Sequence, residues 1–195
     1  MEQLINDIQN YIPVNDQESK DKELFLELLD SQDNIFNRKN KVCHITASCW
    51  ITNQDFTKVL MAYHNIYNSW AWLGGHADDD HNLKHVALKE AKEESGLSKI
   101  KLLSEDIASL EILCVQGHYK HGEYVSDHLH LNITYLLVAD ENEMLQHKAD
   151  ENSAVAWFKL DEAPSMSNEQ RFKEVIYPKL NNRLKALKAN RKDYF

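Results

Sequence analysis

The sequence has no long apolar segment and no cysteine pattern that would define a site. No run of about eighteen or more apolar residues occurs, so no part of the chain is typical of a membrane-spanning helix. The beginning, MEQLINDIQNYIPVND, lacks the charged and then apolar pattern of a secretion signal. The three cysteines are an odd number without CxxC spacing, which indicates neither a disulfide framework nor a cysteine zinc site. We therefore expect a soluble, cytoplasmic protein without a membrane partner.

The composition fits one domain with a full core. Of the 195 residues, 43% are hydrophobic, which leaves room for a small helical appendage. The net charge of -9 argues against long nucleic acid as a partner, although it allows a polyanionic substrate that arrives with metal ions. Residues 171–195 reverse this balance, with eight Lys or Arg against two acids, as is typical of the solvated face of a terminal helix.

Helical and strand-like segments follow one another along the chain. Apolar residues recur at helical spacing on both sides of Pro13 within residues 1–40, which predicts a helical extension. The predicted strands cover residues 44–51, 58–63, 70–73, 109–117, 128–139 and 154–158. The other predicted helices are residues 82–95, closed by Gly96, and residues 168–195 with an interruption near Pro178. We expect an α+β fold in which a mixed sheet is flanked by helices, divided into residues 1–40, 41–165 and 166–195.

Three glutamates lie on one side of the predicted helix 82–95. Within LKEAKEESGL, Glu90, Glu93 and Glu94 occupy positions i, i+3 and i+4, so their carboxylates project in nearly one direction. Like charges placed in this way repel each other, and a bound cation would offset the repulsion. Oxygen donors without cysteine suit a hard ion that also binds substrate phosphates, so the predicted cofactor is Mg²⁺ or Mn²⁺. Glutamate-rich runs are commonly solvated helix faces, so the surrounding sequence must distinguish a metal site from such a face.

The surrounding sequence resembles the Nudix box of the Nudix hydrolase superfamily. The family pattern is G-x5-E-x7-R-E-U-x-E-E-x-G-U, where U is aliphatic, and it matches from Gly75 to Leu97 without a gap. His81 stands in place of the first glutamate and Lys89 in place of the arginine. The stretches HITASCWI, WAWLGGH, DHLHLNITYLL and DENSAVAWF also resemble parts of Nudix proteins.

This resemblance implies an α/β/α sandwich and a reaction. The implied reaction is metal-dependent hydrolysis of a diphosphate linkage in a nucleoside diphosphate joined to another moiety. The implied metal ligands are Glu90, Glu93, Glu94 and the carbonyl of Gly74. The implied catalytic residues are Glu93, Glu94 and Glu151, the last of which lies six residues before Trp157.

The two departures from the box remove an ion pair that orients the helix in the family. A histidine and a lysine at positions 81 and 89 do not form that salt bridge. Our hypothesis is that Asp80 pairs with Lys89 instead. Gly74 and Gly75 are expected to form a turn, and residues 78–80 an exposed loop.

Aromatic and histidine side chains outside the box are the predicted substrate contacts. His128 and His130 occupy alternate positions of one strand, so they face the same side of the sheet. Aromatic rings suit stacking on a base, and imidazoles suit contacts with phosphate or sugar oxygens. The predicted substrate-binding residues are His44, Trp70, Trp72, His128 and His130, with His118 as a further candidate. A His-x-His pair can also bind zinc, although no third or fourth ligand follows at a recognised spacing.

Two other functions stay open at the level of sequence. Nudix-fold isopentenyl-diphosphate isomerases carry a degenerate box and rely on a cysteine and on histidine metal ligands, whereas the intact Glu93–Glu94 pair favours hydrolysis. A nucleotide sensor would retain binding, with His81 and Lys89 marking lost turnover. The expected partner is a small nucleotide diphosphate, and homodimerisation is a further expectation. The sequence sets neither the nucleobase nor the leaving group.

Overall fold

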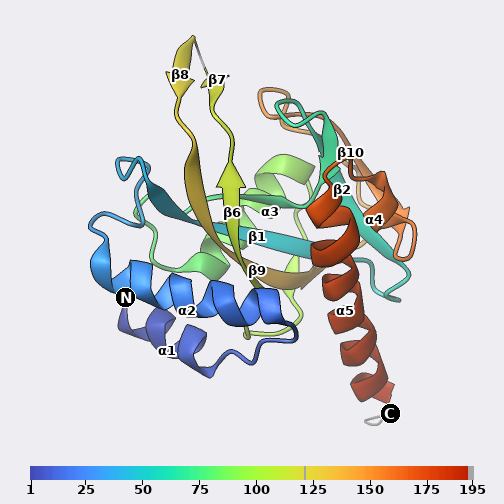
Figure 1. The fold of residues 1–195 in the computed structure, drawn as a ribbon. Coiled ribbons are helices and arrows are strands. Elements are labelled where there is room, and N and C mark those ends of the chain that lie inside the picture. The colour runs from blue at the N-terminus through green and yellow to red at the C-terminus, as the bar shows by residue number, and fades with distance from the viewer. Residues whose placement is uncertain (121, 193–195) are drawn as a thin grey trace.

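A curled mixed β-sheet lies between helices in the computed structural model, which describes residues 1–120 and 122–192 (Figure 1). The helices are α1 (Glu2–Asn10), α2 (Asp16–Ser31), α3 (Leu83–Ser95), α4 (Ala163–Met166), the π-helix η1 (Phe172–Ile176) and α5 (Tyr177–Lys192). The strands are β1 (Cys43–Thr52), β2 (Lys58–His64), β3 (Ser69–Ala71), β4 (Leu73–His76), β5 (Lys101–Leu102), β6 (Ser109–Val115), β7 (His118–Lys120), β8 (Glu123–Val125), β9 (His128–Val138) and β10 (Asn152–Lys159). The α/β/α sandwich with an N-terminal helical extension is confirmed. None of the described helices is long and apolar enough to cross a membrane.

The sheet is organised around the parallel pair of β1 and β9. Its main order is β10-β2-β1-β9-β5, with β3 added to β2, β4 to β1 and β6 to β9. The β1–β9 register runs from Cys43 opposite Leu129 to Thr52 opposite Val138. The hairpin of β7 and β8 extends beyond the body of the protein, past the ends of β6 and β9 (Figure 1). Strands that are distant in sequence therefore meet at the centre of the sheet.

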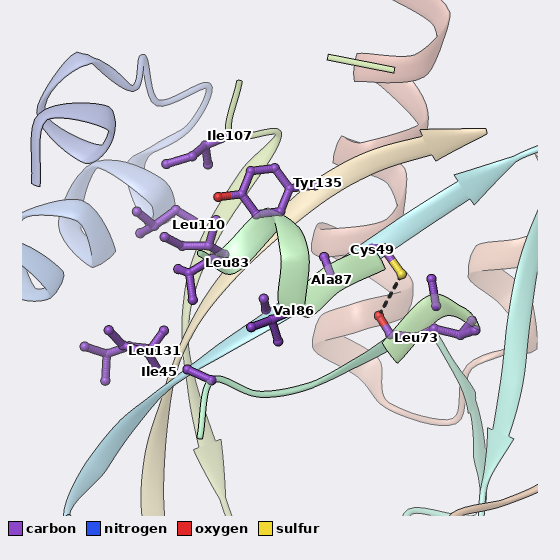
Figure 2. Packing of buried hydrophobic residues seen from close by; sticks show 14 of the residues in the cluster. Ile45, Cys49, Leu73, Leu83, Val86, Ala87, Ile107, Leu110, Leu131 and Tyr135 are labelled. Carbon is purple, nitrogen blue, oxygen red and sulfur yellow. Dashed lines mark hydrogen bonds between the residues drawn. The ribbon is translucent and has the colours of Figure 1, made fainter. Parts of the chain in front are cut away.

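Helices cover both faces of β1, which is buried along its whole length. Ile45 and Cys49 belong to the same hydrophobic cluster as Val86 of α3 (Figure 2). On the other face, Trp50 stacks on Tyr177 of α5 with ring centroids 4.7 Å apart. Because successive strand residues point to opposite faces, one apolar strand supplies both layers of the sandwich.

The glycine pair lies inside strand β4, so the predicted turn is wrong. Gly74 and Gly75 pair with Ser48 and Ala47 of β1. The predicted single strand over residues 70–73 is divided at Trp72, because β3 pairs with β2 whereas β4 pairs with β1. A change of partner strand interrupts the ladder there.

The predicted helices in the N-terminal region and after the glycines are confirmed. Asn82 caps α3 by accepting a hydrogen bond from the backbone N–H of His85 at 3.2 Å, and Gly96 ends α3 with φ 73°. Near Pro178 the chain forms η1 before α5 begins. A proline lacks the N–H that continues a regular helical ladder, which accounts for the change of helix type at this position.

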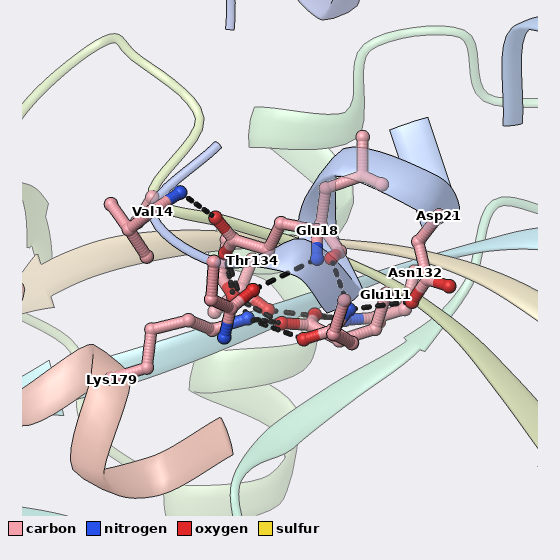
Figure 3. A network of polar contacts seen from close by, with 12 residues as sticks. Val14, Glu18, Asp21, Glu111, Asn132, Thr134 and Lys179 are labelled. Carbon is pink, nitrogen blue, oxygen red and sulfur yellow. Dashed lines mark hydrogen bonds and ion pairs between the residues drawn. The ribbon is translucent and has the colours of Figure 1, made fainter. Parts of the chain in front are cut away.

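A buried ion cluster joins the N-terminal extension, the sheet and the C-terminal helix (Figure 3). The Nζ of Lys179 in α5 lies 2.7 Å from Glu18 of α2 and 2.7 Å from Glu111 of β6. All three side chains are almost fully buried. The other carboxylate oxygen of Glu18 accepts from the backbone N–H of Val14 at 2.9 Å. Lys179 therefore neutralises two carboxylates that lie far apart in the sequence.

Replacing Lys179 by Met should lower the free energy of unfolding by about 3–5 kcal/mol, because buried Glu111 loses its cation and buried Glu18 keeps only the contact with Arg183 at 3.8 Å. Urea unfolding followed by circular dichroism measures this change. The control is Lys185→Met, which removes an exposed pair with Asp161 and should have little effect. Equal losses in the two variants would contradict a special role for Lys179.

Candidate functional site

Three carboxylates from two parts of the chain meet beside β4. Glu90 and Glu94 come from α3, and Glu151 comes from the loop before β10. Each offers an oxygen atom, and these atoms all lie within 4.8 Å of one another. Glu90 and Glu94 are 8% and 4% exposed, whereas Glu151 is half-buried. The helix spacing in the sequence thus brings two predicted metal ligands together, and the fold adds the third carboxylate.

The backbone of β4 fixes how these carboxylates lie. A Cβ atom at position 75 would lie 2.6 Å from Cδ of Glu90, so glycine there leaves the space that this carboxylate fills. The backbone N–H of Gly74 donates to one oxygen of Glu94 at 3.1 Å. The side-chain amide of Asn152 donates to its other oxygen at 3.0 Å. Strand and helix are therefore close enough to hold buried carboxylates against the main chain.

The electrostatics of the cluster favour a bound cation. Burial raises the pKa of Glu94 from 4.5 to about 8, and the charges of Glu90 and Glu151 add to this increase against the opposing hydrogen bonds from Gly74 and Asn152. Burial also raises the pKa of Glu90. A carboxylate whose ionised form is destabilised by burial is stabilised when a positive ion joins it. The all-oxygen donor set, and the space that Gly75 leaves for it, fit a hard divalent cation such as Mg²⁺ or Mn²⁺.

Glu93 lies apart from this cluster, although the sequence groups it with Glu90 and Glu94. Its carboxylate lies 3.7 Å from Lys89 and 3.7 Å from Lys148, and its side chain is 41% exposed. Lys148 also contacts Glu151 at 3.1 Å. Sequence reasoning missed Lys148, whose only signal was a position three residues before Glu151. Lys89 and Lys148 thus each contact Glu93 and one carboxylate of the cluster.

The hypothesis that Asp80 pairs with Lys89 is wrong. Asp80 contacts Nδ1 of His85 at 2.6 Å, in the first turn of α3. Lys89 instead contacts Glu90 at 3.3 Å. Lys89 lies one residue before Glu90 and four before Glu93 on the same helix, so it contacts these two carboxylates. Asp80 contacts the nearby His85 instead.

The N-terminal region holds the loop between β4 and α3. His81, which replaces the glutamate of the box, stacks on Phe36 with ring centroids 4.0 Å apart. Arg38 forms two hydrogen bonds with the carboxylate of Asp78, at 2.7 and 2.6 Å. The loop is exposed at Asp78 and Asp79 as predicted, but contacts with residues 36–38 anchor it. His81 therefore has a packing partner outside the box.

A cleft of about 560 Å³ opens over the carboxylates. Its wall includes three cations, Arg38, Lys89 and Lys148, all suited to phosphate oxygens. An apolar part of the wall consists of Ile66, Tyr67, Trp72 and Phe172. The cleft thus combines acidic, basic and aromatic groups.

The predicted substrate-binding residues do not all reach this cleft. Trp72 and His130 line it, whereas His44 and His128 line a neighbouring cavity of about 920 Å³ beneath the β7–β8 hairpin. His118 lines that cavity too. Trp70 instead packs edge-on against Phe158, with ring centroids 4.7 Å apart.

A histidine that the sequence reasoning set aside joins the two cavities. His76 lines both, as does His130. Burial lowers the pKa of His130 far below its ordinary value, and the neighbouring histidines lower it further. His76 was not among the predicted site residues, because the box alignment assigns no role to the residue after its opening glycine.

Comparisons with known proteins agree with this geometry. A family model described as NUDIX domain matches residues 43–180, well over half of the chain. No curated protein matches the chain. Many solved structures share the fold, and three of them illustrate the low identity.

The first of these is a hydrolase of the NUDIX family from Clostridium perfringens, 22% identical with a TM-score of 0.53, covering 74% of this chain and 97% of that one. A C. elegans Ap4A hydrolase binary complex is 18% identical with a TM-score of 0.53, covering 75% and 98%. The E. coli dihydroneopterin triphosphate pyrophosphohydrolase is 17% identical with a TM-score of 0.51, covering 71% and 95%.

The raised pKa of Glu94 predicts how stability without metal depends on pH. The folded protein holds a proton on Glu94 up to about pH 8, whereas the unfolded chain releases it near pH 4.5. The contribution of Glu94 to stability is therefore fully present below pH 4.5 and is lost as the pH rises through about 8.

In EDTA, the free energy of unfolding of the wild type should fall between pH 5 and 8 relative to Glu94→Gln, by about a few kcal/mol. Denaturant titrations at several pH values measure it, and addition of Mg²⁺ at pH 8 should restore part of the loss. The control variant is Glu105→Gln at the exposed pair with Lys84. Parallel pH profiles for the wild type and Glu94→Gln would refute the prediction.

Proposed function

Because the chain belongs to the NUDIX domain family, we propose that it hydrolyses a diphosphate linkage in a nucleoside diphosphate joined to another moiety. The observation that carries this proposal is the cluster of Glu90, Glu94 and Glu151 at a cleft that Arg38, Lys89 and Lys148 also line. A diphosphate would meet these cations beside a metal ion held by the carboxylates. The names of the similar E. coli and C. elegans structures, a pyrophosphohydrolase and an Ap4A hydrolase, support a phosphoanhydride substrate.

The proposed cofactor is Mg²⁺ or Mn²⁺. Glu90, Glu94 and Glu151 would hold it, together with the Gly74 carbonyl that the family resemblance implies. When bound, the cation supplies positive charge to the substrate phosphates and so favours attack at phosphorus. The hydrogen bonds from Gly74 and Asn152 keep the carboxylate of Glu94 oriented for this purpose.

Glu93 is the proposed proton acceptor for the attacking water. It lines the cleft on the same helix as Glu90 and Glu94 but lies outside the cluster, and its side chain is 41% exposed, so it stays accessible to water. Lys89 and Lys148 flank it, each 3.7 Å from its carboxylate, and a carboxylate within reach of water can act as a general base. Lys148 also lies close enough to Glu151 to orient that carboxylate.

The remaining wall is the proposed site for the nucleoside and its leaving group. Trp72 and Tyr67 offer ring faces for a base, and His130 offers a polar contact at the inner end. His44 and His128 line the neighbouring cavity, where a longer substrate would extend. The isomerase alternative is not favoured, because the similar solved structures are named as hydrolases.

We further propose that residues 41–165 form the catalytic unit and that residues 1–40 and 166–195 pack on it. The contacts of Lys179 with α2 and β6 support this arrangement. A cytoplasmic location and a homodimer stay predictions, which cell fractionation and analytical ultracentrifugation test.

Purified protein with Mg²⁺ should release a nucleoside monophosphate from at least one member of a panel. The panel contains nucleotide sugars, dinucleoside polyphosphates and ADP-ribose, with isopentenyl diphosphate to detect isomerisation. Chromatography of the products gives the result, and EDTA should abolish turnover. Nucleotide binding without any product would contradict hydrolysis and favour a nucleotide sensor. Isomerisation of isopentenyl diphosphate would favour the isomerase alternative.

The variants Glu93→Gln and Glu94→Gln should fail in different ways. Glu93→Gln should lower kcat by about 10²–10⁴-fold with little change in metal affinity, because a proton acceptor is lost. Glu94→Gln should weaken Mn²⁺ binding, since it removes a buried ligand. Kinetics together with Mn²⁺ titration separate the two effects, and Glu23→Gln on the exposed face of α2 is the matched control. Loss of Mn²⁺ binding in Glu93→Gln would overturn this division of roles.

A further inference from the structure

Three histidines from three strands gather on one face of the sheet, next to the carboxylate cluster. His44 of β1 lies directly opposite His130 of β9 in the parallel register. His76 of β4 lies opposite Thr46, the next residue of β1 on the same face as His44. The strand order therefore places three imidazoles together, although 32 and 54 positions separate them along the chain.

The three rings form a nearly equilateral group. Their centroids lie 5.1 Å apart for His44 and His76, 4.9 Å for His44 and His130, and 4.9 Å for His76 and His130. Each ring offers a nitrogen atom, and these three nitrogen atoms lie within 4.8 Å of one another. A set of converging imidazoles is a donor set for a transition-metal ion, unlike the all-oxygen set of Glu90, Glu94 and Glu151.

A hydrogen bond fixes the tautomer of His44 within the group. Nδ1 of His44 lies 3.1 Å from the carbonyl oxygen of Asn40, which only accepts, so Nδ1 carries the proton and Nε2 keeps its lone pair. That Nε2 is buried and has no hydrogen-bond partner among the described residues. A ring whose Nδ1–H donates to a backbone carbonyl while Nε2 points inward has the usual arrangement of a metal-binding histidine.

His128 repeats this arrangement beside the group. Its Nδ1 lies 2.8 Å from the carbonyl oxygen of Ser126, and its Nε2 lies 3.2 Å from Nε2 of His130. Two nitrogens bound to one tetrahedral Zn²⁺ at about 2.0–2.1 Å are about 3.3 Å apart, close to this separation. His128 is therefore placed to supply a fourth nitrogen.

We propose that His44, His76 and His130 bind a zinc ion, with His128 at the fourth position, in a site separate from the carboxylate cluster. The site lies where the cleft meets the second cavity, since His76 and His130 line both. Zinc suits it because Zn²⁺ accepts a tetrahedral set of imidazoles, whereas Mg²⁺ prefers oxygen. The ion would add positive charge to the wall of the cleft, and its binding does not depend on the proposed hydrolysis.

The test is a titration of the chelator-stripped full chain with Zn²⁺ alone, in which calorimetry measures the binding. One Zn²⁺ per chain is expected. His130→Ala and His44→Ala should each weaken binding by at least about 100-fold, because loss of a residue that only orients a metal ligand already costs about 10–100-fold. Glu94→Gln and the exposed control His147→Ala should bind Zn²⁺ as the wild type does.

Spectroscopy of the wild type keeps the proposal testable if a histidine variant fails to fold. Co²⁺ added to the stripped wild type should give the intense visible absorption of a tetrahedral site, and Zn²⁺ should displace it. Failure of the wild type to bind Zn²⁺, or weak octahedral Co²⁺ absorption, would overturn the proposal. So would loss of Zn²⁺ binding in Glu94→Gln with retention in a folded His130→Ala. None of these readouts uses hydrolysis, so failure of the hydrolase proposal leaves the zinc result independent.

Discussion

Strand β4 lies so close to helix α3 that only glycine fits at position 75 without displacing Glu90. The candidate site depends on this approach, because it holds the carboxylate of Glu90 against the strand and brings Gly74 within hydrogen-bonding distance of Glu94. Desolvation of Glu94 follows from the same approach, and so does its raised pKa. The close packing of β4 against α3 thus buries carboxylates whose ionised forms a bound cation would stabilise.

The N-terminal extension supports this arrangement from outside the matched residues 43–180. Phe36 stacks on His81, and Arg38 pairs with Asp78, so the loop that leads from β4 into α3 has fixed contacts. These contacts lie at the loop where the sequence departs from the Nudix box at position 81. The loss of one orienting ion pair is therefore accompanied by a different restraint on the same loop. Lys179 in turn ties the extension to the sheet through Glu18 and Glu111.

The sequence predicted what depends on local spacing. Residues 82–95 were predicted as a helix closed by Gly96, and α3 spans Leu83–Ser95 with Gly96 as its C-cap, because a glycine that ends a helix is a local signal. The spacing of Glu90 and Glu94 was sufficient to place both on one side of that helix. Glu151 was predicted from its spacing to Trp157, and the structure places it beside them. For these residues, helix geometry or a sequence motif is enough to predict the position without knowledge of the tertiary fold.

The sequence did not predict what depends on which strands pair. The glycines lie inside a strand because β4 pairs with β1, and no local signal records that partner. Glu93 lies outside the cluster and contacts Lys148, a residue distant in sequence. His76 meets His44 and His130 only through the register of three strands. Contacts between residues that strand pairing brings together therefore cannot be predicted from one sequence.

Alternation along β4 separates two kinds of donor. Gly75 faces α3 and the carboxylates, so His76, the next residue, faces the opposite side, toward His44 and His130. Both sides border the same cleft. Seven acidic residues line this cleft, in a chain whose net charge is -9, so an anionic substrate would be repelled without added positive charge. The lysines offset part of that repulsion. Cations bound by the carboxylates on one side of β4, or by the imidazoles on the other side, would offset the rest.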